Sequence, residues 1–153
     1  MPTRRAHPGV PESDSVAHAE CDGIEGGSVT AGIDRIATIT IAVRDQDEAL
    51  AWFTEKLGFE KRTDMAAPGM RWLTVAPKEQ QDVEVLLASW FPNLIGKNAA
   101  WVLATRDCRQ TYDELKRRGV AFSQEPTQRP YGLEAVFQDL YGNAYALIER
   151  RPE

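Results

Sequence analysis

The chain has 153 residues, with 42% hydrophobic and 27% charged content and a formal net charge of −5 at pH 7, which is typical of one globular domain or two small halves. Lys and Arg are scattered along it, whereas a nucleic-acid-binding protein needs a clustered basic surface, so we expect no nucleic-acid partner. No apolar run approaches the roughly 20 residues of a membrane span, so we expect no membrane association either.

Residues 1–32 differ in composition from the rest of the chain. They hold five of its eleven glycines, no aromatic residue, and both of its histidines, His7 and His18. Their apolar residues are isolated and follow no period, so the segment cannot bury enough surface to offset the entropy lost on ordering. We therefore expect a disordered or loosely packed tail over 1–32 and a folded domain over 33–153.

The cysteines and the first residues of the chain indicate in which cellular compartment the protein is expected. The two cysteines, Cys21 and Cys108, are too few for a disulfide framework. The opening residues MPTRR are not followed by the apolar segment of a secretory signal peptide. A reducing cytoplasm is the expected location.

The first predicted element is a strand within residues 36–45, IATITIAVRD. Its side chains alternate, with Ile39, Ile41 and Val43 on one side and Thr38, Thr40 and Ala42 on the other. A period of two with one apolar side indicates a strand that packs one face on a core. The Thr side then faces either water, as is common in antiparallel sheets, or an internal cavity.

A helix follows this strand, and the same pattern occurs again 62 residues later. Asp45 is placed to cap the start of the first helix and Gly58 to cap its end. Asp107 and Gly119 hold the same places in a second helix, 62 and 61 positions further on. The segments PGMRWLTVA and VEVLLA after the first helix match YGLEAVFQD and NAYALIE after the second.

The repeat predicts two β-α-β-β-β modules, at about residues 33–92 and 98–151. Their motifs, AVRDQDEALAWFTEKLGFE, RDCRQTYDELKRRGV and VFQDLYGNAYALIE, resemble in order and spacing those of the vicinal oxygen chelate superfamily, which includes glyoxalase I, bleomycin-resistance proteins and extradiol dioxygenases. The turn DLYGN departs from the usual DPDGN but keeps Asp139, Gly142 and Asn143. The resemblance implies an α+β fold of two tandem modules, whose curled mixed sheet surrounds a cup for a small molecule. Family members pair their modules within one chain or across a dimer, and we expect a homodimer.

Metal-using members of that superfamily place His on the first strand of each module and Glu on the last. The resemblance puts Thr38, Glu84, Ala100 and Ala146 at these positions, so that only Glu84 retains a ligand. Zinc and iron sites need imidazole, thiolate or several carboxylates, and residues 33–153 contain no histidine. Cys108 lies on the apolar stripe of a helix and is expected to be a small buried residue. We therefore expect neither a metal nor another cofactor.

Glu84 shares a predicted strand face with Leu86 and Ala88. If this face points into the cup, the carboxylate could act as a general base or as the counter-ion of a cationic ligand. The alternative is an acid that points to solvent near a sheet edge. The sequence leaves both open.

Arg71 and Trp72 follow each other on one predicted strand, so only one of them can point into the cup. Trp72 would stack on a planar ligand or pack in the core, and Arg71 would bind a carboxylate or a phosphate. Trp90 is a candidate for the hinge between the modules, the rim of the cup or a dimer contact, and Tyr131 is either an aromatic residue of a turn or part of the rim. Glu134 is predicted to hold the place in the second module that Arg71 holds in the first.

The expected function is the binding of a small organic molecule in the cup without a conventional metal site. It is either sequestration, as the resemblance to bleomycin-resistance proteins implies, or an uncharacterised enzyme activity that uses Glu84. The alternative is a metal-dependent glyoxalase-like lyase or dioxygenase with unconventional ligands. The expected ligand-binding residues are Thr38, Thr40, Arg71, Trp72, Glu84, Trp90 and Tyr131.

Overall fold

The computed structural model describes residues 32–33, 35–98 and 100–150, and the chain divides into a unit of residues 1–34 and a unit of residues 35–153. The tail predicted over 1–32 lies outside the described residues except for Gly32. Within the described part of the chain, no helix combines the length and the apolar character that crossing a membrane requires.

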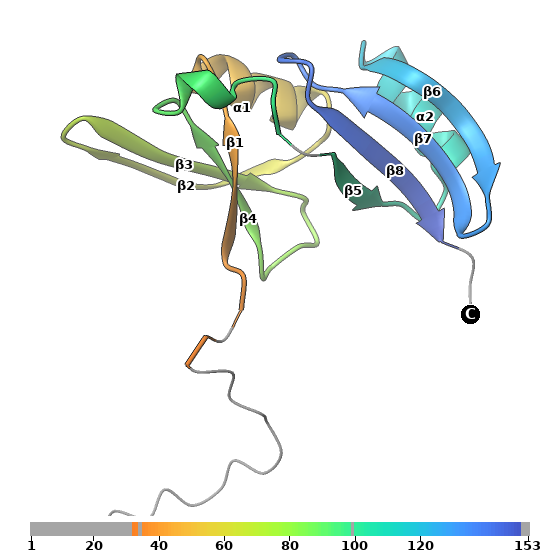
Figure 1. Cartoon of the computed structure of the whole chain (residues 1–153), viewed down its shortest axis with the longest axis horizontal. Coiled ribbons are helices and arrows are strands. Elements are labelled where there is room, and N and C mark those ends of the chain that lie inside the picture. The colour runs from red at the N-terminus through yellow and green to blue at the C-terminus, as the bar shows by residue number, and fades with distance from the viewer. Residues whose placement is uncertain (1–31, 34, 99, 151–153) are drawn as a thin grey trace, which may run out of the picture. The chain divides into compact units, whose positions relative to one another are not determined.

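The larger unit consists of two β-α-β-β-β modules, as predicted (Figure 1). Module one contains β1 (Thr38–Ala42), α1 (Gln46–Glu55), β2 (Glu60–Ala67), β3 (Met70–Ala76) and β4 (Glu84–Ala88). A short 3-10 helix, η1 (Pro92–Leu94), precedes module two, which contains β5 (Trp101–Ala104), α2 (Cys108–Arg117), β6 (Ala121–Arg129), β7 (Gly132–Gln138) and β8 (Ala144–Arg150). The predicted α+β class is confirmed.

Each module folds its strands into a four-stranded mixed sheet with the same topology. The strand orders are β1-β4-β3-β2 and β5-β8-β7-β6. The first and last strands of a module pair in parallel, and the other pairs are antiparallel. Each helix contacts the last three strands of its own module and covers one face of that sheet, as is visible for α2 behind β6 and β7 in Figure 1.

The predicted capping residues define both helices. The carboxylate of Asp45 accepts hydrogen bonds from the backbone N–H groups of Asp47 and Glu48 at 2.9 and 3.0 Å, and Asp107 accepts one from Gln110 at 2.9 Å. These bonds satisfy N–H groups that have no partner within the helix. After the helices, Gly58 and Gly119 adopt φ values of 71° and 87°, a left-handed conformation that glycine reaches without strain.

The hydrophobic core lies between each helix and its sheet. Its buried members include Ile41, Phe53, Leu73 and Leu87 in module one and Cys108, Phe137 and Leu147 in module two. The predicted role of Cys108 as a buried apolar residue agrees with this position, and burial raises the pKa of its thiol.

The DLYGN turn connects module two to module one. The buried carboxylate of Asp139 accepts hydrogen bonds from Tyr141 N, Asn143 N and Asn143 Nδ2 at 2.8–3.0 Å. Asn143 Oδ1 accepts a hydrogen bond from the backbone of Asn98, whose side chain donates to Thr40 O at 2.8 Å. The turn therefore fixes the connection between the modules against strand β1.

Candidate functional site

The sheet of module one has a helix face, which packs on α1, and an open face on the other side. Strand register places on the open face Thr38, Thr40, Trp72, Thr74, Glu84 and Leu86. Ile41 and Leu87, with the opposite parity, lie in the core under the helix. The threonines of the first strand therefore point away from the helix, as the alternation indicated.

Glu84 lies on the open face and is held by a neighbouring strand. Its carboxylate accepts a hydrogen bond from Thr74 Oγ1 at 2.5 Å, and its backbone partner across the sheet is Thr38. Thr74 is fully buried, and its oxygen also accepts a hydrogen bond from Thr63 N at 3.0 Å. Because a carboxylate accepts hydrogen bonds and does not donate them, the hydroxyl proton of Thr74 points to Glu84 and orients the half-buried carboxylate.

Trp72 shares the open face with Glu84, whereas Arg71 lies on the helix face. The guanidinium of Arg71 makes two contacts of 2.8 Å with Asp64 and one of 2.8 Å with Asp47. This arrangement lowers the pKa of Asp64 to about 2. Arg71 therefore ties the β2–β3 hairpin to the start of α1, and it is not brought together with Glu84 in a common site.

The two rim candidates are separated. Trp90 follows β4 and is half-buried beside Phe91, with ring centroids 5.9 Å apart. Tyr131 lies in the turn between β6 and β7, is 52% exposed, and donates a hydrogen bond to Glu134 Oε2 at 2.7 Å. Because Glu134 is on the sheet of module two, on the face away from α2, Tyr131 lies in module two and not beside Trp90.

The open face of module two carries a polar cluster beside an apolar strip. The strip consists of Val102, Ala104, Val136, Ala146 and Ile148. Glu134 is the centre of the cluster, which we define as Gln124, Arg129, Tyr131 and Glu134. Its carboxylate accepts from Tyr131 and from Gln124 Nε2 at 3.2 Å, and Arg129 Nε lies 3.4 Å away.

These contacts keep Glu134 charged. The Tyr131 hydrogen bond, followed by the contacts with Gln124 and Arg129, lowers the pKa of Glu134, and the same carboxylate raises the pKa of Tyr131. Sequence reasoning did not find Gln124 or Arg129. Strand alternation could not have placed them together, because an irregularity between Gln124 and Thr127 shifts the parity of β6.

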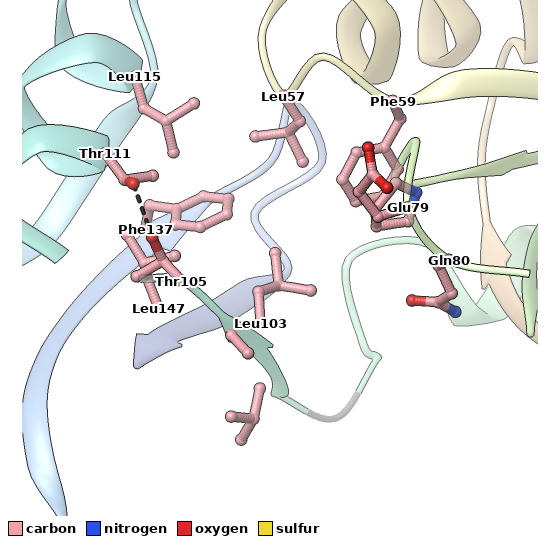
Figure 2. Close-up of a pocket in the computed structure, with 13 residues that line it drawn as sticks. Leu57, Phe59, Glu79, Gln80, Leu103, Thr105, Thr111, Leu115, Phe137 and Leu147 are labelled. Atoms are coloured by element: carbon pink, nitrogen blue, oxygen red, sulfur yellow. Dashed lines mark hydrogen bonds between the residues drawn. The ribbon is translucent and has the colours of Figure 1, made fainter. Parts of the chain in front are cut away.

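A cleft lies between the modules, on residues that sequence reasoning did not select (Figure 2). Its volume is about 570 Å³. Figure 2 shows Thr105, Thr111 and Leu115 on one side, Phe59, Glu79 and Gln80 on the other, and Leu57 and Leu103 between them. An adjoining pocket of about 400 Å³ shares Phe59, Pro77, Gln80, Val102 and Leu103 with the cleft.

Comparison with known proteins agrees with this architecture. A family model of the Glyoxalase/Bleomycin resistance protein/Dioxygenase superfamily matches residues 33–147. The chain belongs to this superfamily.

Two solved structures of superfamily relatives are similar over most of the domain. UcmS2 is 43% identical, with a TM-score of 0.71 over 76% of this chain and 98% of that one. TnmS3, an antibiotic binding protein from Streptomyces sp. CB03234, is 32% identical, with a TM-score of 0.72 over 78% of this chain and 98% of that one. YurT of Bacillus subtilis strain 168, an uncharacterized protein, is 35% identical over 76% of this chain and 99% of its own length.

The strand register corrects two of the matches that the sequence repeat predicted between positions of module one and positions of module two. Leu86 pairs with Thr40 and Thr74, whereas Ala146 pairs with Val102 and Val136. Ala146 is therefore the counterpart of Leu86, and Ala144, two residues earlier, is the counterpart of Glu84. Val136 likewise matches Thr74, so Glu134, two residues before Val136, corresponds to Trp72 and not to Arg71. The counterpart of Glu84 is displaced because the loop between the last two strands is longer in module one.

The residues at the superfamily's metal positions do not fit a metal ion. Of Thr38, Glu84, Ala100 and Ala144, only Glu84 carries a strong ligand group, and its carboxylate is engaged by Thr74. One carboxylate and a threonine hydroxyl do not provide the donors of a zinc or iron site. Across the residues that the structure describes, no three His, Cys, Asp or Glu side chains are grouped so that they could hold a metal ion.

Proposed function

We propose that this chain binds a small planar organic molecule on its open faces and sequesters it, without a metal. The proposal depends on one observation about the open face of module one. The aromatic side chain of Trp72 lies on the same side of the sheet as the Glu84 carboxylate, which Thr74 holds by a hydrogen bond. The antibiotic-binding relative TnmS3 supports the same class of function. The donor set at the metal positions argues against the alternative, a metal-dependent lyase or dioxygenase.

Each residue of the open face has a defined role in this proposal. The indole of Trp72 offers an aromatic surface for a planar ring system, and Met65, its partner across the hairpin, extends that surface. Glu84 accepts a hydrogen bond from an amino or hydroxyl group of the ligand, or pairs with its positive charge. Thr38 and Thr40 supply further hydroxyl groups on the neighbouring strand.

A second copy of the chain completes the site in this proposal. Each open face exposes apolar side chains that a single chain leaves in water, with Met65 61% and Val102 59% exposed. Covering such a surface is favourable, because burial of apolar area drives association. A homodimer would enclose the ligand between two sheets, one contributing Trp72 and Glu84 and the other the polar cluster around Glu134.

The proposal is tested with 9-aminoacridine, a planar cation, by isothermal titration calorimetry. Trp72→Ala is expected to weaken its binding about ten-fold, and Trp72→Phe, which keeps an aromatic ring, much less. Glu84→Gln is expected to weaken binding about five-fold. The control is Trp52→Phe, since Trp52 lies on α1. Unchanged affinity in both Trp72→Ala and Glu84→Gln would refute the proposed site.

Sequestration and catalysis differ in what happens to the bound molecule. If the chain only sequesters, the probe is recovered unchanged after prolonged incubation and chromatography. Chemical conversion of the probe that is lost in Glu84→Gln would instead assign Glu84 as a general base and make the protein an enzyme.

A further inference from the structure

The cleft between the modules has the dimensions and lining of a ligand site, and it shares only the edge residues Val102 and Ala104 with the apolar strip of the module-two open face. Its volume of about 570 Å³ lies within the range that holds drug-sized molecules. None of Trp72, Glu84 and Glu134 lines it. Its lining also includes Phe137 and Leu147, which are part of the hydrophobic core of module two.

One wall of the cleft is held in place by hydrogen bonds from Arg62, whose side chain is partly buried. Arg62 Nη2 donates hydrogen bonds to the carbonyl oxygens of Pro77, Lys78 and Gln80 at 3.0, 3.0 and 3.1 Å. Three bonds to one short segment restrict its conformations, so the wall that carries Pro77, Glu79 and Gln80 is formed in advance of any ligand. Such preorganisation favours binding, because less conformational entropy is lost.

A pair of hydroxyl groups provides a polar anchor on the opposite side. Thr105 Oγ1 and Thr111 Oγ1 lie 2.8 Å apart, and Thr105 Oγ1 also reaches Asp107 O at 3.3 Å. If Thr105 donates to Asp107, then Thr111 donates to Thr105, and the oxygen of Thr111 keeps a free lone pair. A ligand hydroxyl can donate to that oxygen while its apolar part contacts Leu103 and Leu115.

The charges that line the cleft indicate which ligands it disfavours. Among the residues that the structure describes, Glu79 is the ionisable side chain in its lining, and no Lys or Arg side chain lines it. An anionic ligand would be repelled by the Glu79 carboxylate without a cation in the lining to offset this. An uncharged molecule loses little hydration free energy when it enters a mostly apolar site. The remaining lining residues are mostly aliphatic or aromatic, which suits a hydrocarbon body.

From these contacts we infer that the cleft is a second binding site, for an uncharged and mostly apolar alcohol or phenol whose hydroxyl donates to Thr111. The site does not use Trp72, Glu84 or Glu134, to which the sequestering function on the open faces is assigned. A ligand bound here contacts both modules, because Leu57 and Phe59 come from one and Leu103, Thr111 and Leu115 from the other. Its binding therefore stabilises their mutual arrangement.

The test uses 2-naphthol as the probe and methyl resonances of the full chain as the readout. Binding in the cleft shifts the methyl signals of Leu57, Leu103, Leu115 and Leu147, and leaves those of Leu86, on the open face, in place. Naphthalene-2-carboxylate, an anion, and 2-methoxynaphthalene, which cannot donate a hydrogen bond, are each expected to bind more weakly by about three- to ten-fold.

Substitutions separate this site from the open face. Thr111→Val is expected to lower the affinity for 2-naphthol to that of 2-methoxynaphthalene, whereas Thr54→Val, on the other helix and outside the cleft lining, leaves it unchanged. The inference is overturned if no cleft methyl signal moves, if the anion binds as tightly as the phenol, or if Thr111→Val has no effect. Shifts of Leu86 that vanish in Trp72→Ala would also overturn it and would place the probe on the open face.

Discussion

Lys56 and Arg118 each donate a hydrogen bond to the backbone carbonyl oxygen of the other, from Lys56 Nζ and from Arg118 Nη1. They are the C-cap residues of α1 and α2 and lie 62 positions apart, the interval of the sequence repeat. The carboxyl ends of two equivalent helices therefore meet, and each receives a cation where its carbonyl groups lack partners within the helix.

Removal of either cation is expected to destabilise the chain. Lys56→Met and Arg118→Gln should each lower the free energy of unfolding by about 0.5–1 kcal/mol, measured by urea denaturation. Lys78→Met serves as the control, since this exposed lysine lies in the loop between β3 and β4. Equal stability of Lys56→Met and the control would show that the reciprocal contact contributes nothing.

Asp139 is expected to be the most sensitive residue of the turn between β7 and β8. Besides its bonds to Tyr141 and Asn143, its carboxylate accepts a hydrogen bond from the buried hydroxyl of Tyr145 at 2.8 Å. Asp139→Ala leaves these buried donors without a partner and should cost about 2–4 kcal/mol in thermal or urea unfolding. Tyr145→Phe removes one donor and should cost about 1 kcal/mol. Asp113→Ala, on the exposed side of α2, should cost much less.

The ion pair of Asp64 and Arg71 predicts a pH dependence. The pKa of Asp64 in the folded chain is about 2, below its ordinary value of 3.8. The stabilisation from the charged carboxylate is therefore fully present above about pH 4 and is lost as the pH falls through about 2. In Arg71→Gln the pKa of Asp64 should rise toward 3.8, which carboxyl NMR titration measures. A pKa that stays near 2 would show that Arg71 is not the cause.

Thr74 is expected to act as a positioning residue for Glu84. Thr74→Val removes the hydroxyl that orients the carboxylate and should weaken 9-aminoacridine binding by about as much as Glu84→Gln, with a loss of stability of about 1–2 kcal/mol. Thr74→Ser keeps the hydroxyl and should retain most of the affinity. A purely structural role would lower stability in Thr74→Val and leave the affinity of the folded protein unaltered.

The proposed homodimer predicts an effect of charge on the open face. Met65→Glu places a carboxylate on an exposed apolar position and should shift the protein from dimer to monomer in size-exclusion chromatography with light scattering. Lys78→Glu, in the loop between β3 and β4, should not change the mass. A monomeric wild-type protein at micromolar concentration would contradict the proposal.

The sequence predicts the local elements of this fold well, because they depend on near neighbours. The alternation at Thr38–Ala42, the caps at Asp45 and Asp107, and the glycines that end both helices are all local signals, and the structure confirms them. The repeat of these signals predicts the two modules. Burial of Cys108 also follows from its place on a helical stripe.

The arrangement of site residues depends on partners that are distant in the chain. Asp47 and Asp64 bind Arg71 and thereby decide the side of the sheet to which it points. Alternation along a strand shows only that neighbouring residues point to opposite sides, and it does not tell which residue points to which side. The counterpart of Glu84 could not be assigned from the sequence, because the two loops before the last strands differ in length. The cleft could not be predicted either, since its walls come from both modules.

Trp72 and Glu134 occupy matching positions on the open faces of two modules that share one topology. Since each side chain lies away from its own helix, a replacement there leaves the core beneath untouched. One module can thus carry an aromatic surface and the other a charged one, and each can change by its own mutations. Selectivity for new ligands can evolve, or be engineered, one half at a time.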